Sequence, residues 1–380
     1  MKSVREAEVK GKKVFLRADF NIPIENGKIG DNNRIKAVIP TIKYLLEKKA
    51  RIIIGTHLGR PEGKVNTKYS TVPVARELAH LLNMEVEATD HVVSSIVDEK
   101  ISKMQEGEII VLGNLRFHPE EEANEKSFAK KLASYADIYV NDAFAVSHRA
   151  NASVEAITEY LPSYAGLLLE SEMTSLNLLL DNPEHPFVLV IGGSKIKDKA
   201  GTLNFLAEKA DQVLIGGAVA NTFLAARGEE MGKSLVDSEM FETCKQIMEK
   251  FGPKIHLPID FEKEVVDGGF SCMDIGPRTR DDFRSVVADA KCVFWNGNMG
   301  YTENERFRKG TEEIAEAMIK NTYTTVIAGG DTVGFIDKFD LHDGISFIST
   351  GGGAAMQYLA GEELPGIAAL NREQASKLVS

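Results

Sequence analysis

Hydrophobic residues in this chain gather in short runs, and the residues that close the runs differ between its two halves. In the first half the runs close with cationic or hydrogen-bonding side chains: VFLRADFN (14–21), RIIIGTHLGR (51–60), IIVLGNLRFH (109–118) and IYVNDAFAVSHR (138–149). In the second half they close with glycine clusters: FVLVIGGSKIKDK (187–199), VLIGGAVAN (213–221), CVFWNGNMG (292–300), TVIAGGDT (325–332) and ISFISTGGG (345–353). Short apolar runs bounded by Gly or Asn are typical of buried strands.

Segments of helical period lie between the runs, as in IKAVIPTIKYLLEKK (35–49) and TVPVARELAHLLN (71–83). This alternation predicts βαβ units, and therefore an α/β fold in which helices cover both faces of parallel sheets. Because 380 residues exceed what one hydrophobic core usually supports, we expect two domains. A Leu-rich stretch that runs into Asn-Pro and His-Pro, within residues 160–186, predicts a helical connector between them.

The residues that close each run are the candidates for function, because ligands of open parallel sheets bind beyond the carboxyl ends of the strands. The first set of closing residues offers side chains that would hold a small polyanion. The second set offers backbone N–H groups that phosphates can approach closely. Two anion sites of different kinds indicate phosphoryl transfer.

Charge and composition narrow the class of ligand. The formal net charge of −11 repels polyanions at long range, which argues against a nucleic-acid surface and favours a compact anionic metabolite. The first twenty residues are charged throughout, and no stretch has the roughly 18 consecutive apolar residues that span a bilayer, so we expect a cytoplasmic protein without membrane partners. The 3 cysteines are widely spaced and form no CxxC pair, which favours buried thiols over disulfides or a zinc site.

Four arginines are candidates for the first anion site. Arg60, Arg116 and Arg149 each lie just beyond a predicted strand, and Arg34 lies at a predicted helix start. A guanidinium binds phosphate or carboxylate with two parallel hydrogen bonds and stays charged at physiological pH. Each arginine alone would be interpreted as a surface ion-pair residue, but together they predict a site for one phosphate-bearing acid.

His57 and His148 stand beside these arginines, and Asp19 and Asn21 lie in RADFN. A histidine near a bound anion tends to be protonated and to donate a hydrogen bond; a structural role and a covalent phosphate carrier are the alternatives. Asp19 and Asn21 would exchange hydrogen bonds with the hydroxyl groups of a bound acid, or else shape a turn.

The glycine-rich runs of the second half contain the candidate nucleotide site. In GGSKIKDK, Lys195 and Lys199 are four residues apart, so a helical turn would place both ammonium groups on one face, facing phosphate oxygens. A solvated lysine pair is the ordinary alternative. In GGDT, Asp331 is either the N-cap of the following helix or a ligand of Mg²⁺, and both roles are compatible. The glycines of STGGG precede another helix, where amides favour negative charge or serve close packing.

Taken in order, the motifs RADFN, NNRIK, THLGRP, NLRFHPEE, NDAFAVSHR, GGSKIKDK, WNGNMG, GGDT and STGGG resemble the phosphoglycerate kinase family over nearly the whole chain. The resemblance implies two Rossmann-like domains facing a central cleft with a hinge. It also implies a monomeric enzyme of glycolysis and gluconeogenesis. That enzyme would transfer phosphate reversibly, in line and with Mg²⁺, from 1,3-bisphosphoglycerate to ADP when the domains close.

The resemblance also implies a division of the chain. Residues 1–165 would form the 3-phosphoglycerate-binding domain, 166–186 the connector and 187–363 the nucleotide-binding domain, and residues 364–380 would return to the first domain.

The positions that match the family's functional residues fall into three groups. The glycerate-binding positions are Asp19, Phe20, Asn21, Arg34, His57, Leu58, Gly59, Arg60, Arg116 and Arg149. The nucleotide-binding positions are Lys199, Glu303, Gly329, Gly330, Asp331 and Thr332. The positions that would stabilise transition-state charge are Arg34, Lys195, Gly330 and Gly352. Asp331 would position the complex of Mg²⁺ with ADP or ATP.

Some positions depart from the family pattern. Gly113 stands where Glu is usual, Asn151 where His is usual, Asn298 where Pro is usual and Ala328 where Gly is usual. None of these changes removes a charged group assigned to catalysis. We expect Ala328 to restrict slightly the approach of the backbone to the phosphates.

Two rival functions are compatible with such a fold. A nicotinamide-dependent dehydrogenase would carry GxGxxG after a strand, and the chain has no such motif. A catalytically silent protein that binds a nucleotide or metabolite would have no need to keep Lys195, Lys199, Asp331 and Arg34 together.

Overall fold

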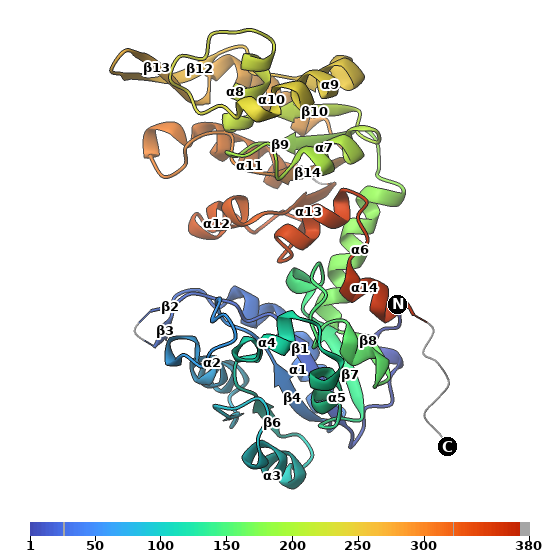
Figure 1. The fold of residues 1–380 in the computed structure, drawn as a ribbon. Coiled ribbons are helices and arrows are strands. Elements are labelled where there is room, and N and C mark those ends of the chain that lie inside the picture. Colours follow the sequence, from blue (N-terminus) through green and yellow to red (C-terminus); the bar gives the residue numbers. More distant parts are fainter. Residues whose placement is uncertain (26, 322, 373–380) are drawn as a thin grey trace. The chain divides into compact units, whose positions relative to one another are not determined.

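The computed structural model describes residues 1–25, 27–321 and 323–372, and its chain divides into two compact units (Figure 1). Unit 1 comprises Met1–Met173 and Glu363–Ser380, and unit 2 comprises Thr174–Glu362. The division falls within one helix, α6 (Leu167–Asp181).

Unit 1 is built on a six-stranded parallel sheet with the strand order β5-β6-β4-β1-β7-β8. Its strands, including the short antiparallel pair β2 and β3, are β1 (Lys13–Ala18), β2 (Ile24–Glu25), β3 (Lys28–Ile29), β4 (Arg51–Gly55), β5 (Glu87–Ala88), β6 (Ile109–Val111), β7 (Ile138–Asp142) and β8 (Ser163–Ala165). Its α-helices besides α6 are α1 (Asn33–Glu47), α2 (Val72–Leu82), α3 (Ser95–Lys103), α4 (Pro119–Glu122), α5 (Lys126–Ala133) and α14 (Pro365–Asn371). Its 3₁₀ helices are η1 (Val4–Glu6), η2 (Thr67–Tyr69), η3 (Leu115–Phe117), η4 (Phe144–Val146) and η5 (Ala156–Glu159).

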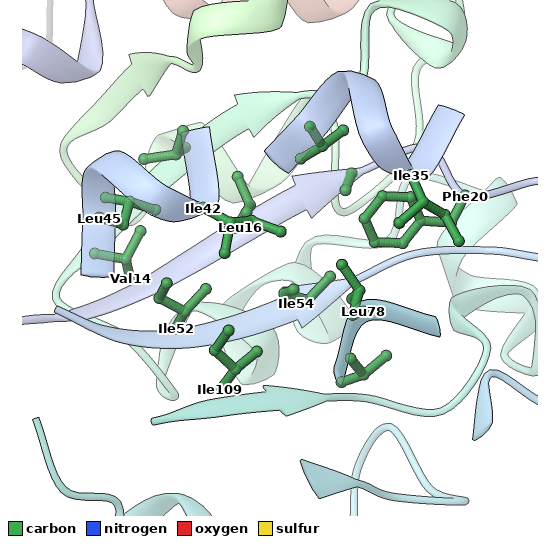
Figure 2. Close-up of a cluster of buried hydrophobic side chains, with 14 of the residues drawn as sticks. Val14, Leu16, Phe20, Ile35, Ile42, Leu45, Ile52, Ile54, Leu78 and Ile109 are labelled. Atoms are coloured by element: carbon green, nitrogen blue, oxygen red, sulfur yellow. The ribbon is translucent and has the colours of Figure 1, made fainter. Parts of the chain in front are cut away.

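One face of this sheet packs against α1 and α2 (Figure 2). Alternate residues of neighbouring strands, such as Val14 and Leu16 of β1 and Ile52 and Ile54 of β4, point into the same cluster as Ile42 of α1. Successive strand residues face opposite sides of a sheet, so this cluster takes one half of each strand. Burying each such side chain stabilises the fold by roughly 1.5–3 kcal/mol.

Unit 2 is built on a second six-stranded parallel sheet, with the strand order β11-β10-β9-β14-β15-β16. Its strands, including the antiparallel hairpin of β12 and β13, are β9 (Phe187–Ile191), β10 (Gln212–Ile215), β11 (Ile255–His256), β12 (Phe261–Val266), β13 (Gly269–Ile275), β14 (Cys292–Asn296), β15 (Thr324–Ile327) and β16 (Phe347–Ile348). Its α-helices are α7 (Ala200–Ala207), α8 (Gly217–Ala226), α9 (Phe241–Phe251), α10 (Pro277–Ala288), α11 (Lys309–Lys320), α12 (Gly330–Lys338) and α13 (Gly353–Leu359). Its 3₁₀ helices are η6 (Ser238–Met240), η7 (Gly252–Lys254) and η8 (Glu305–Phe307).

The core of unit 2 joins β9, β14 and β15 to α10, α11 and α12. Trp295 of β14 is fully buried in this cluster with Phe283 of α10 and Met318 of α11. The central strands β9 and β14 are buried along their whole length, and all their residues except Asn296 are apolar, as expected of parallel strands covered on both faces.

The predicted fold class is confirmed, since both units contain parallel sheets covered by helices. The predicted runs form β1, β4, β6, β7, β9, β10, β14, β15 and β16. The antiparallel hairpin of β12 and β13 was not predicted. Part of the C-terminal segment packs within unit 1, where the backbone N–H of Gly366 donates to Ser147 O at 2.9 Å. Residues 373–380, which the sequence assigns to the same returning segment, lie outside the described residues.

Candidate active site

In unit 1, strand β1 lies between β4 and β7 at the centre of the sheet. The loops that follow these strands meet at one sheet edge, because parallel strands end on the same side. Asp19–Asn21 follow β1, and the loop of His57–Arg60 follows β4. Arg116 lies in η3 after β6, and Arg149 follows β7. The sheet topology therefore gathers the predicted anion-binding residues at one edge of unit 1.

Asp19 lies at the centre of this group and is nearly fully buried. It forms an ion pair with Arg34, near the start of α1, and its Oδ1 lies 3.6 Å from His57 Nδ1. Burial alone would raise the pKa of the Asp19 carboxyl, but the neighbouring His57, Arg34 and Arg17 lower it below its usual value. Asp19 Oδ1 also accepts from the backbone N–H of Asn21 at 3.1 Å, so the turn predicted for this segment is present.

His57 differs from the protonated donor expected from the sequence. Burial lowers its pKa to about 3; Asp19 acts to raise the pKa, while Arg17 and Arg116 act to lower it further. The imidazole is therefore neutral at pH 7 in this structure. Expulsion of water and repulsion by nearby guanidinium groups together disfavour a second proton.

The backbone of Gly59 connects two other predicted residues, Asn21 and Arg116. Its backbone N–H donates to Asn21 Oδ1 at 2.8 Å, and its carbonyl accepts from Arg116 Nη1 at 3.0 Å. Gly59 has φ +59°, a conformation that side-chain-bearing residues rarely adopt. Phe20 and Leu58 are buried in the core, so at these two positions only the backbone remains to meet a ligand.

Arg60 and Arg149 are exposed at the ends of their loops. Arg149 Nε donates to His148 Nε2 at 3.2 Å. Arg116 is buried, and its pKa is lowered first by burial and further by Arg17 and Arg149, although Glu122 raises it. Arg116 and Arg149 thus lie close enough for their charges to repel each other.

Arg17 is a residue of this site that the sequence reasoning missed. It lies in β1 and is almost fully buried, with Nε donating to Ser153 Oγ at 2.7 Å and Nη2 lying 3.9 Å from Glu121 Oε1. Its charge acts on the pKa values of Asp19, His57 and Arg116. An arginine inside the apolar run of a predicted strand was the available signal, since a buried guanidinium needs partners.

In unit 2, the glycine-rich loops after the strands line a pocket of about 520 Å³. The predicted residues that line it are Lys199, Gly329, Gly330 and Gly352. Gly329 has φ +99°, and a Cβ there would lie 2.2 Å from Asn296 Nδ2. The loop after β15 can therefore follow this path only with glycine at position 329.

Lys199 is one of the residues that line this pocket. Its ammonium donates to Asn296 Oδ1. Burial lowers the pKa of Lys199 to about 8, although Asp331 and Asp198 act to raise it. Asn296, at the end of β14, is a second residue that the sequence reasoning missed. Its Nδ2 donates to Ala328 O at 2.7 Å, so it joins Lys199 to the loop that follows β15.

Two local expectations for the lysine and aspartate motifs are wrong. Lys195 and Lys199 do not share a helical turn, because α7 begins only at Ala200 and the intervening Ile196 is buried in the core. Lys195 is exposed outside the pocket lining. Asp331 is not the N-cap of α12, since Gly329 occupies that position and Asp331 lies in the first turn.

Of the two remaining predicted nucleotide-binding residues, Thr332 is buried and Glu303 is exposed. The hydroxyl of Thr332 accepts from the backbone N–H of Gly297 at 2.7 Å, so it holds the loop that follows β14. Glu303 lies outside the pocket lining.

The departures from the family pattern have local explanations at two positions. A Cβ at Gly113 would lie 2.7 Å from Asp90 O, so the neighbouring chain occupies the space that a side chain would need. Asn298 is buried and donates to Thr302 Oγ1 at 2.9 Å, within the loop that leads to Glu303.

Asp331, the predicted carboxylate next to the pocket residue Gly330 in the chain, suits a Mg²⁺ ion held largely by nucleotide phosphates. Asp331 is exposed beside Lys199, and Mg²⁺ usually takes one or two protein carboxylates and completes its shell with phosphates and water. Within the described part of the chain, no group of three or more His, Cys, Asp or Glu side chains could hold a metal by itself.

Over those same residues, no helix has the length and apolar character needed to cross a membrane.

Comparison with known proteins identifies the family to which the chain is similar. The family model for phosphoglycerate kinase matches residues 4–362. A phosphoglycerate kinase of Leptospira biflexa is 44% identical over 385 residues, which cover 97% of this chain and 97% of that protein. The structure of phosphoglycerate kinase from Coxiella burnetii matches with a TM-score of 0.88 at 38% identity, covering 97% of this chain and 98% of that one. The phosphoglycerate kinase of Pyrococcus horikoshii OT3 matches with a TM-score of 0.87 at 36% identity and the same coverage.

Proposed function

The chain belongs to the phosphoglycerate kinase family, and we propose that its two units divide the two substrates between them. The enzyme is a phosphotransferase with a carboxyl group as acceptor, and its substrates are phosphoglycerate and ADP or ATP. A catalytically silent binding protein is not favoured, and the dehydrogenase alternative fails on the same findings.

Unit 1 binds the glycerate in this proposal. The observation that carries it is the concentration of cations around buried Asp19, where Arg17, Arg34 and Arg116 all act on the pKa of His57. Arg60, Arg116 and Arg149 hold the phosphate, and Arg34 contributes a guanidinium to the carboxyl end of the substrate. Other contacts come from Asp19 and Asn21, which hydrogen-bond the substrate hydroxyl, from the neutral ring of His57, and from the backbone at Phe20, Leu58 and Gly59.

Unit 2 binds the nucleotide in this proposal. Lys199 and the backbone from Gly329 to Thr332 hold the phosphates in the glycine-lined pocket, where the absence of side chains permits close approach. Glu303 accepts hydrogen bonds from the ribose hydroxyls. Thr332 acts through the backbone and through the loop that its hydroxyl holds. Ala328 is buried with its carbonyl bonded to Asn296, so its methyl group restricts phosphate approach only slightly.

Mg²⁺ is the proposed metal, and Asp331 is the side chain that would position it with the nucleotide phosphates. When bound, the ion neutralises charge on the phosphate oxygens. The backbone at Gly330 and Gly352 and the cations Arg34 and Lys195 stabilise the charge that develops on the transferred phosphoryl group. Transfer is direct and in line, so no covalent intermediate on the protein is needed.

Direct transfer requires the reacting oxygen and phosphorus to come within about 3–3.5 Å of each other. We assign this approach to a movement of the two units on substrate binding, which also excludes water. Several expectations from the sequence stay predictions. They are the monomeric state, the cytoplasmic location, the absence of nucleic-acid or membrane partners, and the domain ranges 1–165, 166–186, 187–363 and 364–380.

Crossed binding measurements test the division of substrates. 3-Phosphoglycerate and ADP are titrated separately, by calorimetry, into the wild type, Arg116→Ala and Lys199→Ala. Arg116→Ala should weaken 3-phosphoglycerate binding by about tenfold or more and leave ADP binding within twofold; Lys199→Ala should do the reverse. Loss of ADP binding in Arg116→Ala, or of 3-phosphoglycerate binding in Lys199→Ala, would contradict the division.

A further inference from the structure

Asn114 is fully buried between β6 and η3, and its side chain donates two hydrogen bonds and accepts one. Its Nδ2 donates to Leu58 O at 2.7 Å and to Tyr69 O at 3.1 Å. Its Oδ1 accepts from the backbone N–H of Arg116 at 3.0 Å. The side chain therefore joins its own segment to Leu58 and Tyr69, which lie 56 and 45 residues away along the chain.

Each partner of Asn114 belongs to, or supports, the proposed glycerate site. Leu58 lies inside the loop of His57–Arg60, and Arg116 is one of the proposed phosphate ligands. The ring of Tyr69 packs against Gly59 so closely that a Cβ there would lie 2.3 Å from Tyr69 Cε1. Holding Tyr69 O therefore also fixes the surface against which the loop turns.

The contacts close into a circuit. Asn114 holds the backbone of both Leu58 and Arg116, and the Arg116 side chain returns to the next residue of the loop by donating to Gly59 O at 3.0 Å. Gly59 in turn donates to Asn21 Oδ1 at 2.8 Å. The position of the loop relative to the Arg116 guanidinium is thus fixed at two points, one of which is Asn114.

We infer that Asn114 is a positioning residue, which sets the loop of His57–Arg60 and Arg116 at the spacing that 3-phosphoglycerate requires. The inference rests on the proposed function of unit 1. Without the amide, the buried carbonyl of Leu58 and the partly buried carbonyl of Tyr69 lose this donor, and the loop is free to move relative to Arg116. Displacements of about 1 Å in a substrate-positioning group are enough to weaken catalysis by about two orders of magnitude.

A matched control exists in unit 2. Asn321 is also buried, and its Nδ2 donates to two backbone carbonyls, Val287 O at 2.9 Å and Ala290 O at 2.8 Å. Its Oδ1 accepts from the backbone N–H two residues later, at Tyr323, at 2.8 Å. The bonding pattern repeats that of Asn114, but the contacts are at the ends of α10 and α11 and involve none of the proposed substrate residues.

The experiment compares steady-state kinetics of Asn114→Ala and Asn321→Ala with those of the wild type, with 3-phosphoglycerate and ATP varied in turn. Both variants should lower the melting temperature. Asn114→Ala should raise KM for 3-phosphoglycerate by about tenfold or more and leave KM for ATP within about twofold. Asn321→Ala should change neither KM. If Asn114→Ala does not fold, Asn114→Ser replaces it, because its hydroxyl can still cap the backbone N–H of Arg116, adds no charge, and is too short to reach both carbonyl groups.

Three results would overturn the inference: an unchanged KM for 3-phosphoglycerate, a parallel rise in both KM values, or an equal rise in Asn321→Ala. Arg116→Ala, assayed alongside, separates this failure from failure of the proposed function. If Arg116→Ala raises KM for 3-phosphoglycerate and the Asn114 variant does not, only the positioning role is lost. If Arg116→Ala leaves that KM unchanged, the proposed glycerate site is itself wrong.

Discussion

The lowered pKa of Lys199 predicts that nucleotide binding weakens in mildly alkaline solution. Burial lowers this pKa to about 8. The ammonium is then roughly three quarters protonated at pH 7.5 and only about 3% protonated at pH 9.5. If ADP phosphates bind the cationic form, affinity should fall about 25-fold over this interval, or about 1.9 kcal/mol. A lysine with an ordinary pKa would give a decrease of less than about 1.2-fold.

The assay is isothermal titration of ADP without metal, at constant ionic strength, across this pH interval. The last phosphate ionisation of ADP, with a pKa of about 6, is complete before the interval begins. Lys199→Gln is the control, because it keeps a polar side chain next to Asn296 and cannot titrate. Its affinity should be low and independent of pH. A wild-type affinity that changes less than twofold, or the same slope in Lys199→Gln, would refute the reasoning.

Two further substitutions test the packing and the buried charge of unit 2. Gly329→Ala should lose about 1–3 kcal/mol of stability from its positive φ, and more from the contact with Asn296, and its ADP affinity should fall as well. The control Gly334→Ala, at an exposed position of the following helix α12, should be neutral or stabilising in thermal unfolding. Burial raises the pKa of Asp274 to about 7, so the folded state binds the proton more tightly than the unfolded state. The free energy of unfolding should therefore fall by up to about 4 kcal/mol as pH rises from 4 to 7, and then level off. In urea unfolding followed by the fluorescence of Trp295, Asp274→Asn should lack this component; identical pH profiles for variant and wild type would contradict it.

The strands that carry the site were predictable because parallel strands buried on both faces are nearly continuous apolar runs. The structure brings residues that follow those runs together, as in the contact of Asp19 with His57 and the pocket lined by Lys199 and Gly329; their roles in binding stay predictions. The hairpin of β12 and β13 was missed because its partly exposed strands lack such a run.

What sequence could not provide was the set of contacts made across loops. Arg17 and Asn296 have no special position in a one-dimensional pattern, and their importance comes from the burial and partners that the sheet gives them. The helical turn expected for Lys195 and Lys199 failed for a related reason. Burial of Ile196 in the core, rather than helical spacing, decides where the two ammonium groups lie.

Phosphoryl transfer itself is measured as ATP consumption that depends on 3-phosphoglycerate and magnesium. The bisphosphoglycerate formed is reduced in a coupled reaction, and the wild type is compared with Lys195→Ala. We assign the exposed ammonium of Lys195, which lies outside the lining of the proposed nucleotide pocket, to the transferred phosphoryl group. The wild type should be active. In Lys195→Ala, kcat should fall by about two orders of magnitude or more, while KM for either substrate changes by less than about threefold. An unchanged kcat in Lys195→Ala would contradict the proposed catalytic role, and a wild type that binds ATP without consuming it would contradict the account as a whole.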